Sequence, residues 1–162
     1  PSDPEGMRSA WAALEVEWAT TIDRARALPD GMLHESVEGE WSFVETLRHL
    51  VFAMDKWFTA PILAKPFHPI GMPNSGSVDF PWPGLEYDLT TSVSDALGVR
   101  ADRATRFREY LASVTTADFE RSVDVLENGP HPLQECIYTV FEEEFWHLRY
   151  ARRDLEKLAA SG

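Results

Sequence analysis

Residues 42–60, SFVETLRHLVFAMDKWFTA, decide the fold class because they read as one helix that is apolar on nearly every face. Ser42 and Glu45 match a capping box, in which each side chain hydrogen-bonds the backbone N–H of the other residue at a helix start. Pro61 follows where this helix would end. A helix without a broad polar face is covered by neighbours on several sides. The stretch therefore predicts an inner helix of an all-α protein.

Three further segments show apolar residues at spacings of three and four, which is typical of amphipathic helices. They run from about residue 5 to 28, from 91 to 113, and from just after Pro132 to about 159. Together with 42–60 they predict a four-helix bundle. The turn-rich stretch 115–131 separates the last two helices, and a short strand is predicted at 121–126. The 162 residues are enough for one domain, and we expect a single domain over 1–162.

The connection between the second and third helices, residues 61–88, is rich in helix-breaking residues. Its prolines and glycines are Pro61, Pro66, Gly71, Pro69, Pro73, Gly76, Pro81, Pro83 and Gly84. Such a density excludes long regular elements, while its aromatic residues favour an ordered loop that packs on the bundle. A connection of this length is typical of a lid or binding loop. We expect a long Pro-rich crossover that covers a functional site.

Charge excludes two classes of partner. Fifteen basic against 27 acidic residues give a net charge of -12. Nucleic-acid binding and docking on an anionic membrane both need basic residues, so neither is expected. Hydrophobic residues make up 44% of the chain, which is enough for a packed core.

The single cysteine, Cys136, excludes an intramolecular disulfide and a Cys-rich zinc site. It fits a reducing compartment. The sequence contains no stretch of about 18 apolar residues, and residues 1–6 lack the basic-then-apolar pattern of a signal peptide. We therefore expect a cytoplasmic location.

Two histidines lie within predicted helices, His49 on the second and His147 on the last. Glu143 lies four residues before His147, so both side chains project from one helix face and can reach one metal ion. His49 could supply a third ligand from a facing helix and leave a position open, as in catalytic zinc sites. Glu142 reads as part of a solvated face.

Glu144 competes with Glu143 for this role. It lies nearer the centre of the apolar stripe and forms a Glu-x-x-His pair with His147. A di-iron bundle site needs two such pairs, and this sequence has only one. Spacing does not choose between the two glutamates. A third interpretation is that the buried histidines only hydrogen-bond to nearby groups, without metal.

These motifs resemble those of the DinB-like domain family. Residues 40–50, EWSFVETLRHL, match its Trp-Ser start and its His-Leu at a fixed distance, while Glu143-x-x-x-His147 followed by Arg152 and Leu155 is similar to its last-helix signature. The helix plan and the long connection after the second helix agree with the family. The resemblance implies an up-down-down-up four-helix bundle with a divalent metal ion, zinc or nickel, held by three ligands.

The ligand set implied by the resemblance is His49, Glu143 and His147, with Glu144 as a neighbour. Many members use three histidines. A glutamate in the second place resembles the metal-binding domain of the mycothiol-dependent maleylpyruvate isomerase.

The same resemblance implies a bacterial metal-dependent enzyme that activates a low-molecular-weight thiol such as mycothiol, or water, for transfer, isomerisation or hydrolysis. The alternative is a non-catalytic metal-binding bundle that acts as a stress-response scaffold. His68, Tyr87 and Arg149 are candidates for substrate binding. Exposed apolar faces around Trp57 or Trp82 would favour a homodimer.

Overall fold

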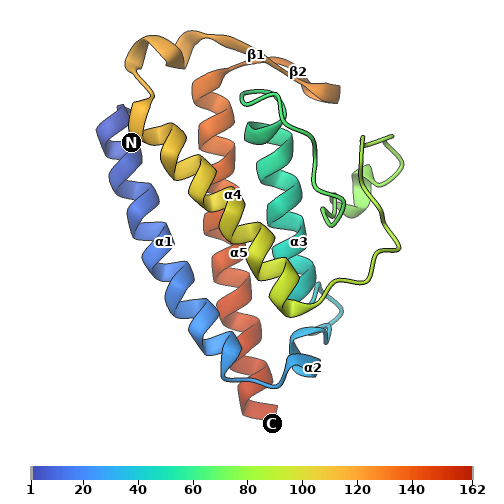
Figure 1. Cartoon of the computed structure of the whole chain (residues 1–162). Helices are drawn as coiled ribbons and strands as arrows, with labels where there is room; N and C mark the ends of the chain where they lie inside the picture. The colour runs from blue at the N-terminus through green and yellow to red at the C-terminus, as the bar shows by residue number, and fades with distance from the viewer. Residues whose placement is uncertain (1, 162) are drawn as a thin grey trace.

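Four long helices lie side by side in the computed structural model, which describes residues 2–161 (Figure 1). Helices α1 and α5 run in one direction, and α3 and α4 run in the other (Figure 1). A small two-stranded sheet lies across one end of them. The prediction of a mostly helical chain is confirmed. The helices and strands are α1 (Pro4–Arg26), α2 (Asp30–Leu33), α3 (Phe43–Met54), α4 (Val93–Ser113), β1 (Ser122–Val125), β2 (Gly129–Pro132) and α5 (Leu133–Ser161).

Helix α3 begins as its sequence predicts. The Glu45 backbone N–H donates to the Ser42 hydroxyl at 3.1 Å, and the Ser42 N–H donates to the Glu45 carboxylate at 3.0 Å. Every residue of α3 except Glu45 is buried. Burial on all sides is what a helix without a polar face requires, because exposed apolar surface costs free energy. Helix α3 therefore lies inside the helical body and can present side chains to more than one neighbour.

The second half of the predicted helix 42–60 differs from a regular α-helix, because residues Asp55–Thr59 form a π-helix. The change coincides with a buried ion pair at Asp55, which has no exposed surface. The Asp55 carboxylate accepts from Arg103 of α4 at 2.8 Å and from the His68 backbone N–H at 2.8 Å. The Asp55 carboxylate thus joins α3, α4 and the connection 61–88.

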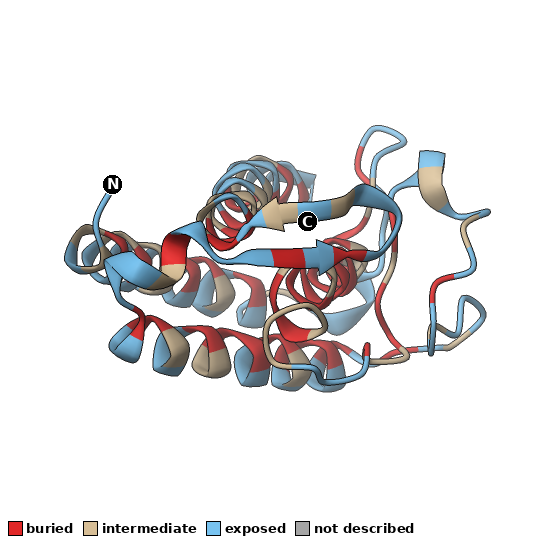
Figure 2. Cartoon of the chain, turned by 90° about the horizontal axis from the view of Figure 1, so that it is seen from above, coloured by how far each residue is buried: buried red, intermediate tan, exposed pale blue. Residues whose placement is uncertain are grey.

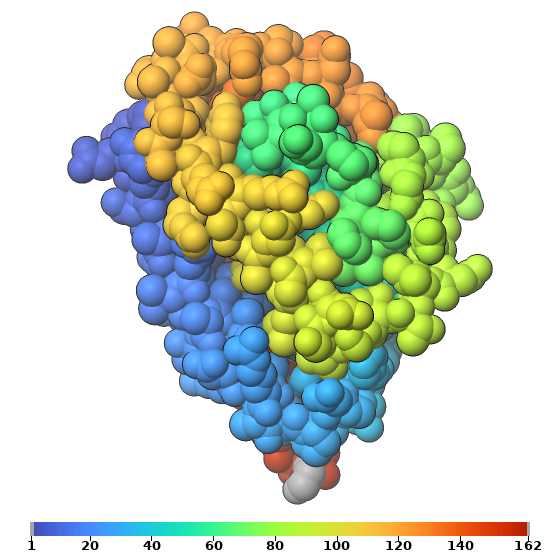
Figure 3. All heavy atoms as spheres, in the orientation of Figure 1, coloured from blue at the N-terminus to red at the C-terminus, as the bar shows by residue number. Residues whose placement is uncertain are grey.

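The Pro-rich connection packs against α3, as expected, and contains one short 3-10 turn, Ser75–Ser77. Its backbone is tied to α3 at residues 70–72, where the Arg48 side chain donates to the Ile70 carbonyl at 2.7 Å and the Met72 N–H donates to the Arg48 carbonyl at 3.2 Å. Between them, Gly71 lies so close to α3 that an added Cβ would meet the Phe52 Cβ at 3.2 Å. The yellow-green atoms of this connection form one edge of the molecule (Figure 3).

Of the two tryptophans expected to offer an exposed dimer face, Trp82 does not. It is 5% exposed and packs on Phe52 and Phe67, with a ring-centroid distance of 4.8 Å to Phe52. Trp57 is half-buried beside His131. Homodimerisation itself stays a prediction.

The stretch between α4 and α5 forms a hairpin (Figure 2). Strand β1 confirms the strand predicted at 121–126, and it pairs antiparallel with β2, which was not predicted. Two of the four residues of β2 are prolines, which are typical of turns and sheet edges and therefore hide a strand from sequence analysis. Helix α2, which is four residues long, was also missed.

The core lies between the long helices and divides into two main apolar clusters, one toward the hairpin and one toward α2. In the first, Trp11 of α1 packs edge-on against Phe107 of α4 at 4.6 Å. No helix among residues 2–161 combines the length and the apolar character needed to cross a membrane.

Candidate metal centre

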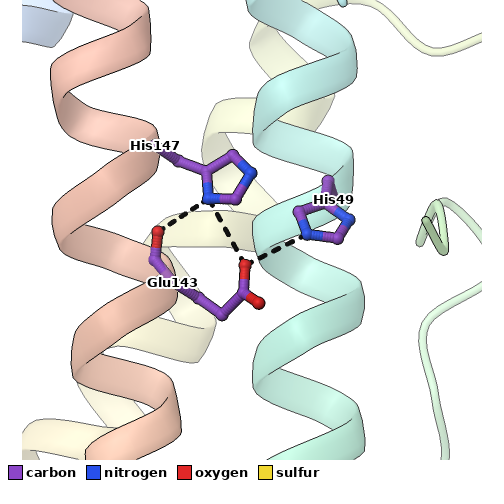
Figure 4. Close-up of side chains that lie close together, drawn as sticks. All are labelled: His49, Glu143 and His147. Atoms are coloured by element: carbon purple, nitrogen blue, oxygen red, sulfur yellow. Dashed lines mark hydrogen bonds and ion pairs between the residues drawn. The ribbon is translucent and has the colours of Figure 1, made fainter.

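Three side chains that are far apart in the sequence meet between α3 and α5. His49 projects from α3 toward Glu143 and His147, which lie one turn apart on α5 (Figure 4). One potential ligand atom from each residue lies within 4.8 Å of the others. His49 is 1% exposed, whereas the other two are partly accessible. The structure therefore brings together all three residues that the family resemblance implied as metal ligands.

Both imidazole rings are held by a backbone carbonyl. His49 Nδ1 lies 2.9 Å from the Met72 carbonyl oxygen, and His147 Nδ1 lies 2.8 Å from the Glu143 carbonyl oxygen. A carbonyl oxygen only accepts, so each Nδ1 carries the proton that it donates. In a neutral imidazole the other nitrogen, Nε2, then offers a lone pair. Hydrogen bonds of this kind orient metal-binding histidines in proteins.

The Glu143 carboxylate lies between the two rings. Its Oε2 atom is 3.2 Å from His49 Nε2 and 3.3 Å from His147 Nδ1. When His49 is neutral, its Nε2 lone pair faces a carboxylate oxygen, which also only accepts. Two acceptors at this distance repel unless a proton or a cation lies between them. The geometry therefore requires positive charge at this point.

Burial and neighbouring charges together set the protonation of Glu143 and His147. Burial lowers the pKa of His147, and the charge of His49 beside it lowers that pKa further. Burial by itself would raise the pKa of the Glu143 carboxyl, but the hydrogen bond with His49 and the nearby charges of His49, His147 and Lys56 together hold that pKa below its usual value. A neutral imidazole and an ionised carboxylate are the forms that bind metal ions.

The structure distinguishes Glu143 from Glu144. Glu144 is 3% exposed, and its Oε2 atom accepts from the Arg100 guanidinium of α4 at 2.8 Å. Arg100 in turn lies over the Trp18 ring at 4.5 Å. The Glu144 carboxylate is thus neutralised on the side of α5 that faces α1 and α4, whereas Glu143 faces α3. Glu142 is exposed, as predicted.

A pocket of about 520 Å³ opens onto the His147 side of this cluster. Its lining residues come from the turn before α3, the first turn of α3, the Pro-rich connection and α5, and they are Gly39, Glu40, Trp41, Thr46, Ser75, His147, Tyr150 and Asp154. The Trp41 ring packs on His49 at a centroid distance of 4.6 Å and lies nearly parallel to His147 at 6.5 Å. The indole thus covers both imidazoles from one side.

The residues predicted to bind substrate lie elsewhere. His68 lines a different pocket, beside Thr91 and the start of α4. Arg149 borders a groove between α1 and α5 and lies over the Trp146 ring at 5.5 Å. Tyr87 is 49% exposed on the connection. None of the three is among the residues that line the pocket at His147.

Sequence analysis missed the residues that do line it, although a signal was present. Trp41 belongs to the quoted Trp-Ser motif, and Tyr150 and Asp154 follow His147 at spacings of three and seven on one helix face.

Cys136 is not part of the candidate site and is not poised to react. Its side chain is fully buried among Val123, Val125 and Trp57. Burial, with a contribution from the negative charge of Glu135, raises the pKa of this thiol to about 11. At pH 8 about a thousandth of such a thiol is ionised, and only the thiolate is nucleophilic.

We therefore expect Cys136 in the native protein to react with an aromatic disulfide reagent at least about a hundredfold more slowly than after unfolding in urea. The released chromophore measures both rates. Equal rates in the two states would contradict the buried position of the thiol.

The fold and the site together define a mostly helical protein with a candidate His/Glu/His metal centre between two facing helices. The family model of the DinB superfamily matches residues 13–151, so the chain belongs to the DinB superfamily. No curated protein and no solved structure gives a significant match.

Proposed function

We propose that this protein is a metal-dependent enzyme that holds one divalent ion, zinc or nickel, through His49, Glu143 and His147. Its reaction is the transfer, isomerisation or hydrolysis of a small organic substrate, with a low-molecular-weight thiol such as mycothiol, or water, as the nucleophile. The long helices then form the up-down-down-up four-helix bundle of the superfamily, with this site between its second and last helices.

The observation that carries the proposal is the arrangement of acceptors around one point. Two carbonyl groups fix the protons on Nδ1 of His49 and His147, which leaves each Nε2 atom as an acceptor, and His49 Nε2 lies 3.2 Å from the Glu143 carboxylate. One potential ligand atom from each of the three residues lies within 4.8 Å of the others, which suits a divalent cation. Two imidazoles and one carboxylate are a common set for catalytic zinc. A protonated His49 paired with Glu143 is the alternative without metal.

The protein residues have separable roles in this proposal. His49, Glu143 and His147 hold the ion, and the Met72 and Glu143 carbonyls orient the imidazoles. A bound divalent ion lowers the pKa of a thiol or water and so provides a nucleophile at neutral pH. Trp41 shields one side of the imidazoles, and the adjoining pocket admits the substrate. Since Cys136 is buried away from this pocket, a thiol nucleophile comes from solution.

Turnover should depend on metal. Purified protein assayed with several bacterial thiols and an electrophilic acceptor is expected to consume thiol, and a chelator is expected to reduce the rate at least about tenfold. Added zinc or nickel should restore the rate. Thiol loss followed by mass spectrometry of the conjugate is the measurement, and the Glu143→Ala variant is the matched control. Metal binding without chelator-sensitive turnover would contradict the enzyme and favour a scaffold.

A further inference from the structure

We propose that the substrate of this site carries a positively charged group, and that Asp154 holds this group at the end of the pocket away from His147. The inference rests on the proposed function, because it takes the reacting end of the substrate to lie at the His49–Glu143–His147 cluster.

The pocket follows one face of α5. Glu143, His147, Tyr150 and Asp154 are spaced by four, three and four residues, which places them in one row along the helix. The last three line the pocket. Seven residues separate His147 from Asp154, which corresponds to about 10 Å along the helix axis. A substrate whose reacting atom lies at the cluster therefore needs a chain of several atoms to reach Asp154.

The charge at the Asp154 end of the pocket is negative. Two carboxylates, Glu40 and Asp154, line it. Both accept from one guanidinium, since Arg153 Nε donates to Asp154 at 3.0 Å and Arg153 Nη2 donates to Glu40. The nearby Glu38 and Lys157 pair with each other at 2.7 Å and add no net charge. Two carboxylates and one guanidinium leave one uncompensated negative charge.

Because Asp154 is buried, its negative charge acts strongly on a group that enters the pocket. Asp154 is only 5% exposed, so solvent screens its charge poorly. A cationic group that enters the pocket would supply the missing counter-charge and a charge-assisted hydrogen bond. A substrate with several carboxylates would instead approach Glu40 and Asp154 with like charge, which disfavours binding.

The remaining lining groups also suit a hydrogen-bonding cation. Thr46 is 4% exposed and lines the pocket, and its hydroxyl makes no hydrogen bond within the described residues 2–161. Thr46 therefore offers the pocket a hydroxyl that a ligand can hydrogen-bond. The aromatic ring of Trp41 on the pocket wall also attracts cations, whereas the Tyr150 ring already carries the Arg153 guanidinium at 5.4 Å.

A matched pair of thiols tests the proposal. Protein loaded with cobalt(II), whose absorption bands report thiolate binding, is titrated with 6-aminohexanethiol and with 6-mercaptohexanoate. The two have equal chain lengths and opposite charges. We expect the amine to bind at least about tenfold more tightly, the size expected for a hydrogen bond between charged groups.

The Asp154→Asn variant should keep its metal content and bring the two affinities within about twofold of each other. The Glu156→Gln variant, changed on an exposed residue of the same helix outside this pocket, should keep the full preference. Equal affinities in the unchanged protein, no binding of either thiol, or a preference that persists in Asp154→Asn would overturn the inference. The unchanged protein decides the question even where a variant fails to fold.

Metal content distinguishes a wrong assignment of Asp154 from a wrong proposed function. A chain that loads one equivalent of cobalt but shows no preference for the amine contradicts the assignment of Asp154 alone. A chain that loads no metal contradicts the proposed function and this inference together.

Discussion

Replacing His49 with alanine should lower the metal content from about one equivalent for each chain to less than about a tenth. His49 is the only one of the three proposed ligands that comes from α3, and its Nε2 atom lies 3.2 Å from the Glu143 carboxylate. Even the loss of a residue that only orients a ligand lowers metal affinity by about 10- to 100-fold. The loss of a ligand should cost at least as much. Metal analysis after dialysis against a weak chelator measures the effect.

The control separates loss of a ligand from loss of the fold. His49 is buried, so the alanine variant also leaves a cavity and loses some stability. Circular dichroism and a urea unfolding curve establish that the variant is folded at the temperature of the metal analysis. His34→Ala removes an exposed histidine and should keep the full equivalent. Metal retained at a full equivalent in folded His49→Ala would show that the ion lies elsewhere or that the cluster is an ion pair.

The helices of this protein were predictable because their signals are local. The capping box at Ser42 and the apolar run after it predicted the start and the burial of α3, and both are as expected. The long helices end within about two residues of their predicted bounds except at Met54. There the π-helix begins at Asp55, whose partners Arg103 and His68 are distant in the sequence. A partner of that kind leaves no periodic signal in the helix itself.

The candidate site was partly predictable for the same reason. Spacing on α5 showed that His147 shares a face with an acidic residue, but Glu143 and Glu144 both satisfied it. The choice depends on Arg100, which lies 44 residues away from Glu144 on another helix and takes its carboxylate. The resemblance to the DinB-like family selected Glu143 without that contact. The orientation of His49 by the Met72 carbonyl was equally hidden, because it depends on the path of the Pro-rich connection.

Burial and helix face decide which side chains line the pocket at His147. His68, Tyr87 and Arg149 were proposed to assist binding because loop residues often carry function, and this role stays a prediction, although none of the three lines that pocket. Asp154 carries no motif, but its place two turns beyond His147 brings it into the pocket. A search of the last helix for residues in register with His147 would have found it.

Replacing Glu144 with alanine should destabilise the protein by about 3–5 kcal/mol while leaving metal binding intact. Arg100 is 6% exposed and would remain as a buried charge without a carboxylate partner. The Trp18 ring beneath the guanidinium stabilises it only in part. Urea unfolding measures the loss, and Glu142→Ala, an exposed neighbour on α5, should change the free energy of unfolding by less than about 0.5 kcal/mol. If Glu144→Ala also changes the free energy of unfolding by less than about 0.5 kcal/mol, other groups must compensate the charge of Arg100.

A double variant shows whether the unpaired Arg100 guanidinium causes the loss of stability in Glu144→Ala. Changing both Arg100 and Glu144 to leucine removes the two charges together, and buried ion pairs replaced by apolar residues are often neutral in stability. The double variant should therefore be more stable than Glu144→Ala by at least about 2 kcal/mol. If it is as unstable as the single variant, packing and not the unpaired guanidinium accounts for the loss.

The two glutamates should then show opposite behaviour, which tests the site more strictly than either variant alone. Glu143 is partly accessible, and among residues 2–161 the ion pairs of its carboxylate are with the two imidazoles, so Glu143→Ala should lose the metal and change stability little when measured without metal. Folded Glu144→Ala should keep about one equivalent. Loss of metal in Glu144→Ala with retention in Glu143→Ala would reverse the assignment. It would place the ion on the α4 side of α5, where Arg100 already supplies the positive charge.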